Sequence, residues 1–541
     1  MKEEVGMKRR GPMWALVAVA AAGLMALSGT PSQAQENIYE NVTGLMGGSS
    51  VPVGAFGTTE ISGFTVAGPR LNPNGIGQYL MGAYYDVRPV NGDAQINNIQ
   101  IINTNTNNVK LDPCEDENFV KGTDGAGCYN PEGGILAKVR FRESKTSLEV
   151  LDFVIALSCG EVWAGKVDLN TTTNLPEIES RYPIVVQPFT STTFPTRPAF
   201  DPNNGGKVQG FVPLGLPNGI TAEDTQRGHF EVIAMEALPC EPQSGDFSLD
   251  GGDWDRLDPQ LSDRTPTNAI GGEIFLVRAL AAASHNYNLA AISGFVELGG
   301  GSIVPLGGPF GDAQPDFADC VATDAAGIPY SSAECVAQSN LALSKSRLVA
   351  QFDVDPTTSG TTDVVVTFPN KYRNCNAANG TWNGARHTGT AFQCAPAGEE
   401  VVCTLYDRQE NYIEEEAGFI SPSTGQDPCT LPREVNIIAL SEAGGLGERG
   451  DIGFATNGLP AGESGWIDID MVRNLAQDVI HVERFADTVT HDILGAYLRG
   501  YHGLPALGLV VQEFVNPGEG RYYGNTVPPL WEQVILKGDQ S

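Results

Sequence analysis

The sequence predicts an all-β protein built of antiparallel, β-sandwich-like sheets with long disulfide-pinned loops and little helix. Short apolar runs alternate with a period of two along most of the chain, as expected for strands that bury one face. The 64 glycines and 35 prolines among 541 residues exceed the usual combined share of roughly 12% and favour turns over long helices. Hydrophobic residues make up 41% of the chain, which is enough for a sizeable core.

Residues 134–167 carry the clearest strand pattern. In the first run, at 137–142, alanine, valine and phenylalanine alternate with one lysine and two arginines. A polar turn at 143–147 separates this run from a second at 148–157, and a third passes through 162–167. We expect an antiparallel meander with one face in the core and the other, which carries the basic side chains, in water.

Similar runs predict further strands along the chain. They are 78–87, 94–103, 210–213, 229–235, 272–280, 288–298, 341–354, 362–368, 401–406, 434–440, 465–471 and 507–515. The turn signal Asn91-Gly92 predicts that the first two form strands around a tight turn, and a short helix is expected within 480–501. A glycine- and proline-rich segment at 299–311 marks the expected boundary between an N-terminal β-rich lobe, 35–300, and a C-terminal β-rich lobe, 301–541.

Residues 1–34 have the features of a Sec-type signal peptide. A basic segment at 8–10 precedes an apolar stretch at 14–27, and the small-x-small motif Ser32-Gln33-Ala34 follows as a cleavage site. The apolar stretch is too short to span a membrane. We therefore expect an exported protein, extracellular, on the cell surface or in the periplasm, with no transmembrane span after cleavage.

The charge of the chain restricts its partners. The formal net charge is −32, and removal of the predicted leader, with four basic and two acidic residues, makes it two units more negative. Nucleic acid and anionic membrane are poor partners for such an acidic surface. The expected partners are the protein itself or a cell-surface glycan or protein.

The cysteines predict disulfides. All ten lie after the predicted leader, and an even number in an oxidising compartment is typical of a disulfide framework. Pairing of close neighbours predicts the bridges Cys114–Cys128, Cys320–Cys335, Cys375–Cys394 and Cys403–Cys429, which leaves Cys159 with Cys240. No C-x-x-C motif is present, which argues against a thioredoxin-like centre, a zinc ribbon or a c-type haem site.

An acidic loop at 245–263 is the one candidate metal site. Asp246, Asp250, Asp253 and Asp255 supply carboxylate oxygens of the kind that Ca²⁺ prefers. Their spacing does not match an EF-hand, and a solvated acidic loop is the simpler interpretation. No other cofactor is expected.

The sequence carries no recognisable catalytic motif. Residues 445–450 match G-x-G-x-x-G, but the segment that follows, DIGFATNG, is not a helix start, so we interpret the match as a turn. Neither G-x-S-x-G, a Walker A motif nor H-E-x-x-H occurs. A glycosidase needs only two facing carboxylates, and 65 acidic residues neither identify nor exclude such a pair. No catalytic residue is therefore predicted.

Seven segments taken together suggest a family. They are 77–87, 137–163, 268–279, 362–372, 433–440, 465–471 and 504–516. In this order they resemble a group of exported, mostly proteobacterial proteins that are usually described as hypothetical or cell-surface proteins. The resemblance implies one integrated β-rich exported protein, and it implies no catalytic residue.

We expect a non-catalytic cell-surface or extracellular protein with a structural or adhesive role, because strands dominate, catalytic motifs are missing and the chain is acidic and rich in cysteine. Two alternatives remain open at this point. One is an extracellular carbohydrate-active hydrolase, and the other is a calcium-dependent glycan-binding protein that uses the loop at 245–263.

Overall fold

The structure is a computed structural model, and it describes only part of the chain. Apart from small gaps within them, the described ranges are 60–65, 69–89, 92–105, 120–121, 128–129, 133–180, 185–186, 207–211, 221–238, 266–278, 283–296, 320, 339–354, 357–369, 399–413, 429–471, 479–482, 499–516 and 521–537. All described residues belong to one compact unit, 38–541. The predicted leader and the predicted lobe boundary at 299–311 both lie outside the described residues.

The all-β prediction is confirmed. Strands contain 65% of the described residues, and all paired strands but one pair are antiparallel. Within the described ranges, helical geometry occurs only in the 3-10 turn η3 (Glu223–Gln226) and in a short segment around 339–343. No helix in these ranges is long and apolar enough to cross a membrane.

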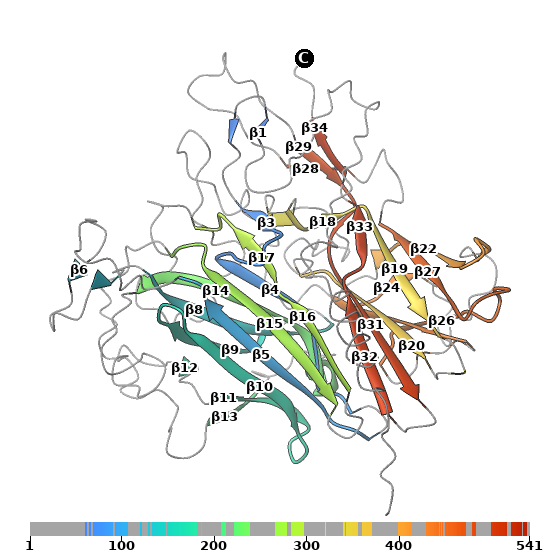
Figure 1. Cartoon of the computed structure of the whole chain (residues 1–541), viewed down its shortest axis with the longest axis horizontal. Helices are drawn as coiled ribbons and strands as arrows, with labels where there is room; N and C mark the ends of the chain where they lie inside the picture. The colour runs from blue at the N-terminus through green and yellow to red at the C-terminus, as the bar shows by residue number, and fades with distance from the viewer. Residues whose placement is uncertain are drawn as a thin grey trace, which may run out of the picture. The chain divides into compact units, whose positions relative to one another are not determined.

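The first sandwich packs a seven-stranded sheet against a six-stranded sheet (Figure 1). The seven-stranded sheet runs in the order β12 (Val185–Val186), β9 (Glu149–Leu157), β8 (Gly134–Glu143), β14 (Arg227–Leu238), β4 (Tyr79–Asp86), β17 (Ala290–Ser293) and β3 (Arg70–Asn72). The six-stranded sheet runs in the order β13 (Lys207–Gly210), β11 (Leu175–Ser180), β10 (Val162–Asn170), β5 (Gln95–Asn103), β15 (Ile270–Arg278) and β16 (Ala283–Asn288). Phe141, Phe153 and Phe230 from one sheet meet Ile99, Ile101 and Trp163 from the other in their common core.

The second sandwich consists of two five-stranded sheets. The β20 sheet runs in the order β26 (Ile452–Ala455), β25 (Val435–Ser441), β20 (Thr361–Thr367), β31 (Leu507–Asn516) and β32 (Arg521–Val527). The β27 sheet runs in the order β23 (Tyr412–Ile413), β22 (Val402–Asp407), β27 (Ser464–Asp470), β19 (Arg347–Asp353) and β33 (Leu530–Glu532). Val364 and Val510 of the first sheet share a core with Leu405 and Ile467 of the second.

Several short strands lie outside the four large sheets. They are β1 (Glu60–Ile61) with β2 (Phe64–Thr65), β6 (Val120–Lys121) with β7 (Cys128–Tyr129), β18 (Ser344–Lys345) with β30 (Leu504–Pro505), β21 (Glu399–Glu400) with β24 (Thr430–Leu431), and the trio β28 (Val479–Val482), β29 (Arg499–His502) and β34 (Val534–Lys537). The helix expected within 480–501 is not seen at either described end of that range, where β28 and β29 pair.

Two predicted strand pairings are wrong. The strands around Asn91-Gly92 exist, but β4 pairs with β14 and β17 in the seven-stranded sheet, whereas β5 pairs with β10 and β15 in the six-stranded sheet. The Asn97 side chain bonds the backbone N–H and C=O of Asp86 between the two layers. The third run of the predicted meander, β10, likewise crosses to the six-stranded sheet, where it pairs with β5 and β11. Of the three predicted runs, only the first two, β8 and β9, pair with each other as a hairpin.

The prediction that the basic face of β8 lies in water is also wrong. Lys138, Arg140 and Arg142 are all buried. Their face of the sheet carries the opposed carboxylate of Glu231 on β14, and beside these charges the same face holds a second apolar cluster. That cluster joins Tyr79, Met81, Leu136, Ile233 and Met235 to chain-distant residues that include Phe295, Leu343 and Leu507. β8 is therefore buried on both faces.

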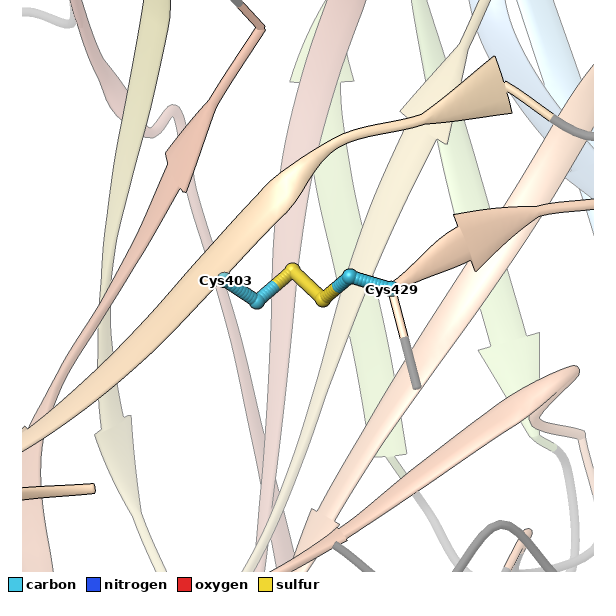
Figure 2. The surroundings of a disulfide bond; sticks show 2 residues. All are labelled: Cys403 and Cys429. Carbon is cyan, nitrogen blue, oxygen red and sulfur yellow. A yellow bond between two sulfur atoms is a disulfide. The ribbon is translucent and has the colours of Figure 1, made fainter. Parts of the chain in front are cut away.

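One predicted disulfide is confirmed. Figure 2 shows the bridge between Cys403, on β22, and Cys429, immediately before β24. Their Cα atoms are 5.9 Å apart, and both side chains are buried in the core of the second sandwich. Cys159 and Cys320 are also disulfide-bonded, and their pairings with Cys240 and Cys335 remain predictions because those partners lie outside the described residues.

Candidate functional site

The outer face of the β27 sheet carries partly exposed side chains. Along β27, Ile467 and Ile469 point into the core, whereas Trp466, Asp468 and Asp470 are only partly buried on the other side. The same alternation runs through β22 and β19. Period-two strands with one covered face necessarily present every second side chain outward, so the outward residues form rows across the sheet.

One of these rows is aromatic. Tyr412 on β23 lies opposite Tyr406 on β22, and Tyr406 lies opposite Trp466 on β27. The ring centroids of Tyr406 and Trp466 are 3.9 Å apart with planes 7° from parallel, and those of Tyr406 and Tyr412 are 5.8 Å apart. We call Tyr412, Tyr406 and Trp466 the aromatic row. Tyr412 is 58% exposed, so aromatic surface reaches solvent at the edge of the sheet.

A charged pair flanks the aromatic row. Arg347 on β19 donates two hydrogen bonds to Asp468, from Nε at 2.7 Å and from Nη2 at 2.6 Å. The guanidinium of Arg347 also lies 6.0 Å from the centre of the Trp466 ring, within the range of a cation–π contact. The hydrogen bonds that Arg347 donates to Asp468 raise the pKa of Arg347 and keep it charged. The face thus combines ring surface with a fixed donor–acceptor pair.

A second cluster lies where the two sandwiches meet. Arg278 of β15 donates to Glu513 of β31 at 2.5 Å, Arg449 donates to it at 3.1 Å, and His285 Nε2 of β16 lies 3.2 Å from it. Burial alone would raise the pKa of Glu513, but His285, Arg449 and Arg278 outweigh burial and hold that pKa well below its usual range. Glu513 is therefore an ionised carboxylate held by cations from both sandwiches.

A second carboxylate in this interface is held in the same way. The Asp86 carboxylate, on β4, accepts a hydrogen bond from the Tyr84 hydroxyl and another from Arg88 Nη2 at 2.7 Å. Burial opposes ionisation of Asp86, yet Arg88 and Arg449 lower its pKa. Arg88 also donates to the backbone carbonyl of Arg449 at 3.2 Å, so this pair too joins the first sandwich to the second.

A third ion-pair group completes the interface. Arg227 of β14 donates to Asp451 at 2.8 Å, Arg433 lies 3.0 Å from the same carboxylate, and Arg433 donates to Asp224 at 2.7 Å. The backbone amides of Glu434 and Val435 both donate to the Ser144 carbonyl. Val365, Ile437 and Leu509 of the β20 sheet pack against the core of the first sandwich beside these bonds. Charge pairs and apolar contact together fix the two sandwiches to each other.

Asp363 and Glu513 invite a catalytic interpretation. Burial raises the pKa of Asp363 to about 6, whereas the pKa of Glu513 is lowered. Two carboxylates with pKa values pushed apart are typical of an acid–base pair. However, one Glu513 oxygen is engaged by Arg449 and His285 and the other by Arg278. A carboxylate saturated in this way acts as a structural anchor.

The buried face of β8 and β14 holds another charged group. Glu231 lies 3.2 Å from Arg142 Nε and 3.8 Å from Arg140, and Arg140 Nε lies 2.6 Å from Glu149. Beside them, burial lowers the pKa of His229 to about 4. Neither ring nitrogen of His229 has a hydrogen-bond partner in the described part of the chain. This imidazole is thus neutral and packed as an apolar group.

The predicted calcium ligands are not placed by the structure. Asp246, Asp250, Asp253 and Asp255 all lie outside the described residues. Within the described ranges, no three or more histidine, cysteine, aspartate or glutamate side chains are grouped so that they could hold a metal ion.

Sequence reasoning missed both the aromatic row and the interface ion pairs. The signal for the row is present, since the pattern GWIDID puts Trp466 on the same face as two aspartates. Tyr412 could not be assigned, because β23 is only two residues long. The interface pairs join residues as far apart as Arg278 and Glu513, and no local pattern links them.

No family model, curated protein or solved structure matches this chain.

Proposed function

We propose that the protein is an exported, non-catalytic cell-surface or extracellular protein with a structural or adhesive role. The observation that carries this proposal is the contrast between the interface of the two sandwiches and the outer face of the β27 sheet. Three ion pairs join the described parts of the two sandwiches at their interface, whereas the outward side chains of β27 remain partly exposed. A rigid scaffold that presents one open face suits adhesion, because little conformational entropy is lost on binding.

Export is supported by the leader-like pattern at 1–34 and by the disulfide between Cys403 and Cys429. Disulfides form and persist outside the reducing cytosol. The resemblance to exported cell-surface proteins agrees with this assignment. These observations support the proposal of an exported protein, on the cell surface, in the extracellular medium or in the periplasm.

The test is a pair of measurements on the purified mature chain. Light scattering with calcium and with a chelator measures self-assembly, and flow cytometry of the fluorescently labelled chain on the producing cells measures adhesion. An unrelated folded protein of similar net charge serves as the control for non-specific charge effects. We expect assembly or saturable cell binding above that control. A monomer under both conditions, with no affinity for cells, glycans or itself, would contradict the proposal.

A further inference from the structure

We propose that His285 is a proton-dependent clamp between the two sandwiches. It holds them with two hydrogen bonds when its ring carries two protons, and with one when its ring carries one. His285 lies on β16, which ends the six-stranded sheet of the first sandwich, and its partners lie on β31 and β32 of the second. The inference concerns the joint between the sandwiches and does not depend on the proposed function.

Both ring nitrogens of His285 face groups that only accept hydrogen bonds. Nε2 lies 3.2 Å from Oε1 of Glu513 on β31, and Nδ1 lies 3.3 Å from the backbone carbonyl oxygen of Asn525 on β32. The Glu513 carboxylate is ionised, because its pKa is held well below the usual range. A neutral imidazole has one N–H and an imidazolium has two. Only the doubly protonated ring can therefore make both bonds.

The ring of His285 is enclosed. Its side chain is 2% exposed, and it occupies the space that a side chain at position 524 would need. A Cβ atom added to Gly524 would lie 2.3 Å from ring Cε1 and 2.7 Å from Nε2. Water therefore has little access to either nitrogen, and a bond that the ring fails to make here is not replaced by a bond to solvent.

Loss of one proton turns one of the two contacts into a repulsive one. If the remaining proton is on Nε2, the lone pair of Nδ1 faces the Asn525 carbonyl oxygen. If it is on Nδ1, the lone pair of Nε2 faces the Glu513 carboxylate, which carries a full charge and is the stronger acceptor. We therefore expect the neutral ring to keep its bond to Glu513 and to lose its bond to β32.

The direction of the pH effect follows from this count of bonds. The clamp is complete in acid, and it loses one bond as the pH rises through about 6 to 7, the range in which histidine side chains commonly titrate. The joint should accordingly be tighter at pH 5.5 than at pH 8.

The charged groups around the ring come from several elements. Arg278 of β15 and Arg449, between β25 and β26, both donate to Glu513, and Asp93 lies 4.0 Å from Arg278 Nε. Both arginines thus meet carboxylates beside the ring. Asp363 of β20 interacts with Arg449 and Glu513, and burial raises its pKa to about 6. Because Asp363 takes up a proton in the same range of pH, the experiment has to remove it.

His229 is an internal comparison. It is buried like His285, but neither of its ring nitrogens has a hydrogen-bond partner in the described part of the chain, and burial lowers its pKa to about 4. Two buried histidines of one chain should therefore differ in protonation at pH 5.5, because one faces two acceptors and the other faces none.

The first test is NMR of the full mature chain labelled with ¹⁵N in its histidine side chains. The ring nitrogen shifts report how many protons each imidazole carries and on which nitrogen. We expect His285 to carry two protons at pH 5.5 and one, on Nε2, at pH 8, whereas His229 stays neutral at both. The His285 signals are assigned by their loss in His285→Gln.

The second test is amide hydrogen exchange read by mass spectrometry, with rates corrected for the intrinsic effect of pH. It uses Asp363→Asn, so that Asp363 no longer titrates. Loss of one hydrogen bond corresponds to about threefold to tenfold, so the amides of β16 and β32 should exchange faster by that factor at pH 8 than at pH 5.5. β22, which lies away from the joint, should show no change. The double variant with His285→Gln should lose the pH dependence.

Three results would overturn the inference. They are a neutral His285 ring in the folded chain at pH 5.5, equal corrected exchange of β16 and β32 at the two pH values in Asp363→Asn, and a pH dependence that persists in the double variant. If His285→Gln does not fold, exchange in Asp363→Asn alone decides, since that measurement leaves position 285 intact.

Discussion

β8 and β27 have the same alternating pattern and opposite surroundings. On β8 the basic side chains of Lys138, Arg140 and Arg142 alternate with core residues, and on β27 Trp466, Asp468 and Asp470 do the same. The polar face of β8 is buried, whereas that of β27 is open. An alternation with a period of two residues therefore identifies the two faces of a strand, but it does not show which face is exposed to water.

The difference has a physical cause in the neighbouring layers. The second face of β8 shares its sheet surface with an apolar cluster that receives Phe295, Leu343 and Leu507 from chain-distant segments. Charges placed beside such a cluster must be paired, because an unpaired buried charge is very costly. On β27 the ion pair of Arg347 and Asp468 stays partly in water, where pairing contributes little to stability.

The largest expected effect comes from removing the buried carboxylate that Arg142 and Arg140 share. Glu231→Gln leaves Arg140 its contact with Glu149 but takes away the shared carboxylate, and it should lower the free energy of unfolding by about 3 kcal/mol. Asp468→Asn makes the same chemical change on the open face and should cost about 1 kcal/mol or less. Urea denaturation of both variants gives the comparison. Equal losses would show that the two faces do not differ in the way described.

The next effect depends on pH. Asp363 has a pKa of about 6 in the folded chain, above its unfolded value of about 3.9. The folded state therefore binds the proton more tightly, and the contribution of Asp363 to stability is lost as pH rises through 4 to 6. Asp363→Asn should remove this loss and raise the free energy of unfolding at pH 8 by about 1–3 kcal/mol.

Glu513→Gln is the matched control with the opposite sign. The pKa of Glu513 is lowered in the folded chain, so its stabilising effect is present above the unfolded pKa and is lost as pH falls. The variant should be less stable than the native chain at pH 8, and the deficit should shrink in acid. Denaturation curves at several pH values measure both effects, and a parallel response of the two variants would contradict this assignment.

The smallest expected effect concerns the aromatic row. Trp466→Ala removes a cross-strand pair from an open face and should lower the free energy of unfolding by about 1 kcal/mol or less. Phe141→Ala removes a buried ring from the core shared by the two sheets of the first sandwich and should cost about 3–5 kcal/mol. Thermal denaturation ranks the two. A loss of stability in Trp466→Ala as large as that in Phe141→Ala would mean that the aromatic row is needed to stabilise the fold.

Local patterns in the sequence predicted the features that depend on neighbouring residues, namely individual strands and one disulfide. The strands β8, β9 and β27 follow from alternation, β20 and β25 follow from short continuous apolar runs, and the bridge between Cys403 and Cys429 follows from proximity along the chain. Which sheet each strand joins depends on distant partners, so the separation of β4 from β5 was not predictable. Neither was the convergence of Arg278, His285 and Arg449 on Glu513, because burial and pairing of these charges exist only after the sandwiches meet.

Hydroxyl-radical footprinting read by mass spectrometry tests the central claim most directly, because it compares the two faces in one experiment. Met81 and Met235 lie on the buried face that also carries Arg140, whereas Tyr412 and Trp466 lie on the open face. Methionine is intrinsically among the side chains most easily oxidised. The account predicts oxidation of Tyr412 and Trp466 in the folded chain with both methionines protected. Oxidation of Met81 and Met235 as fast as Tyr412 would contradict it.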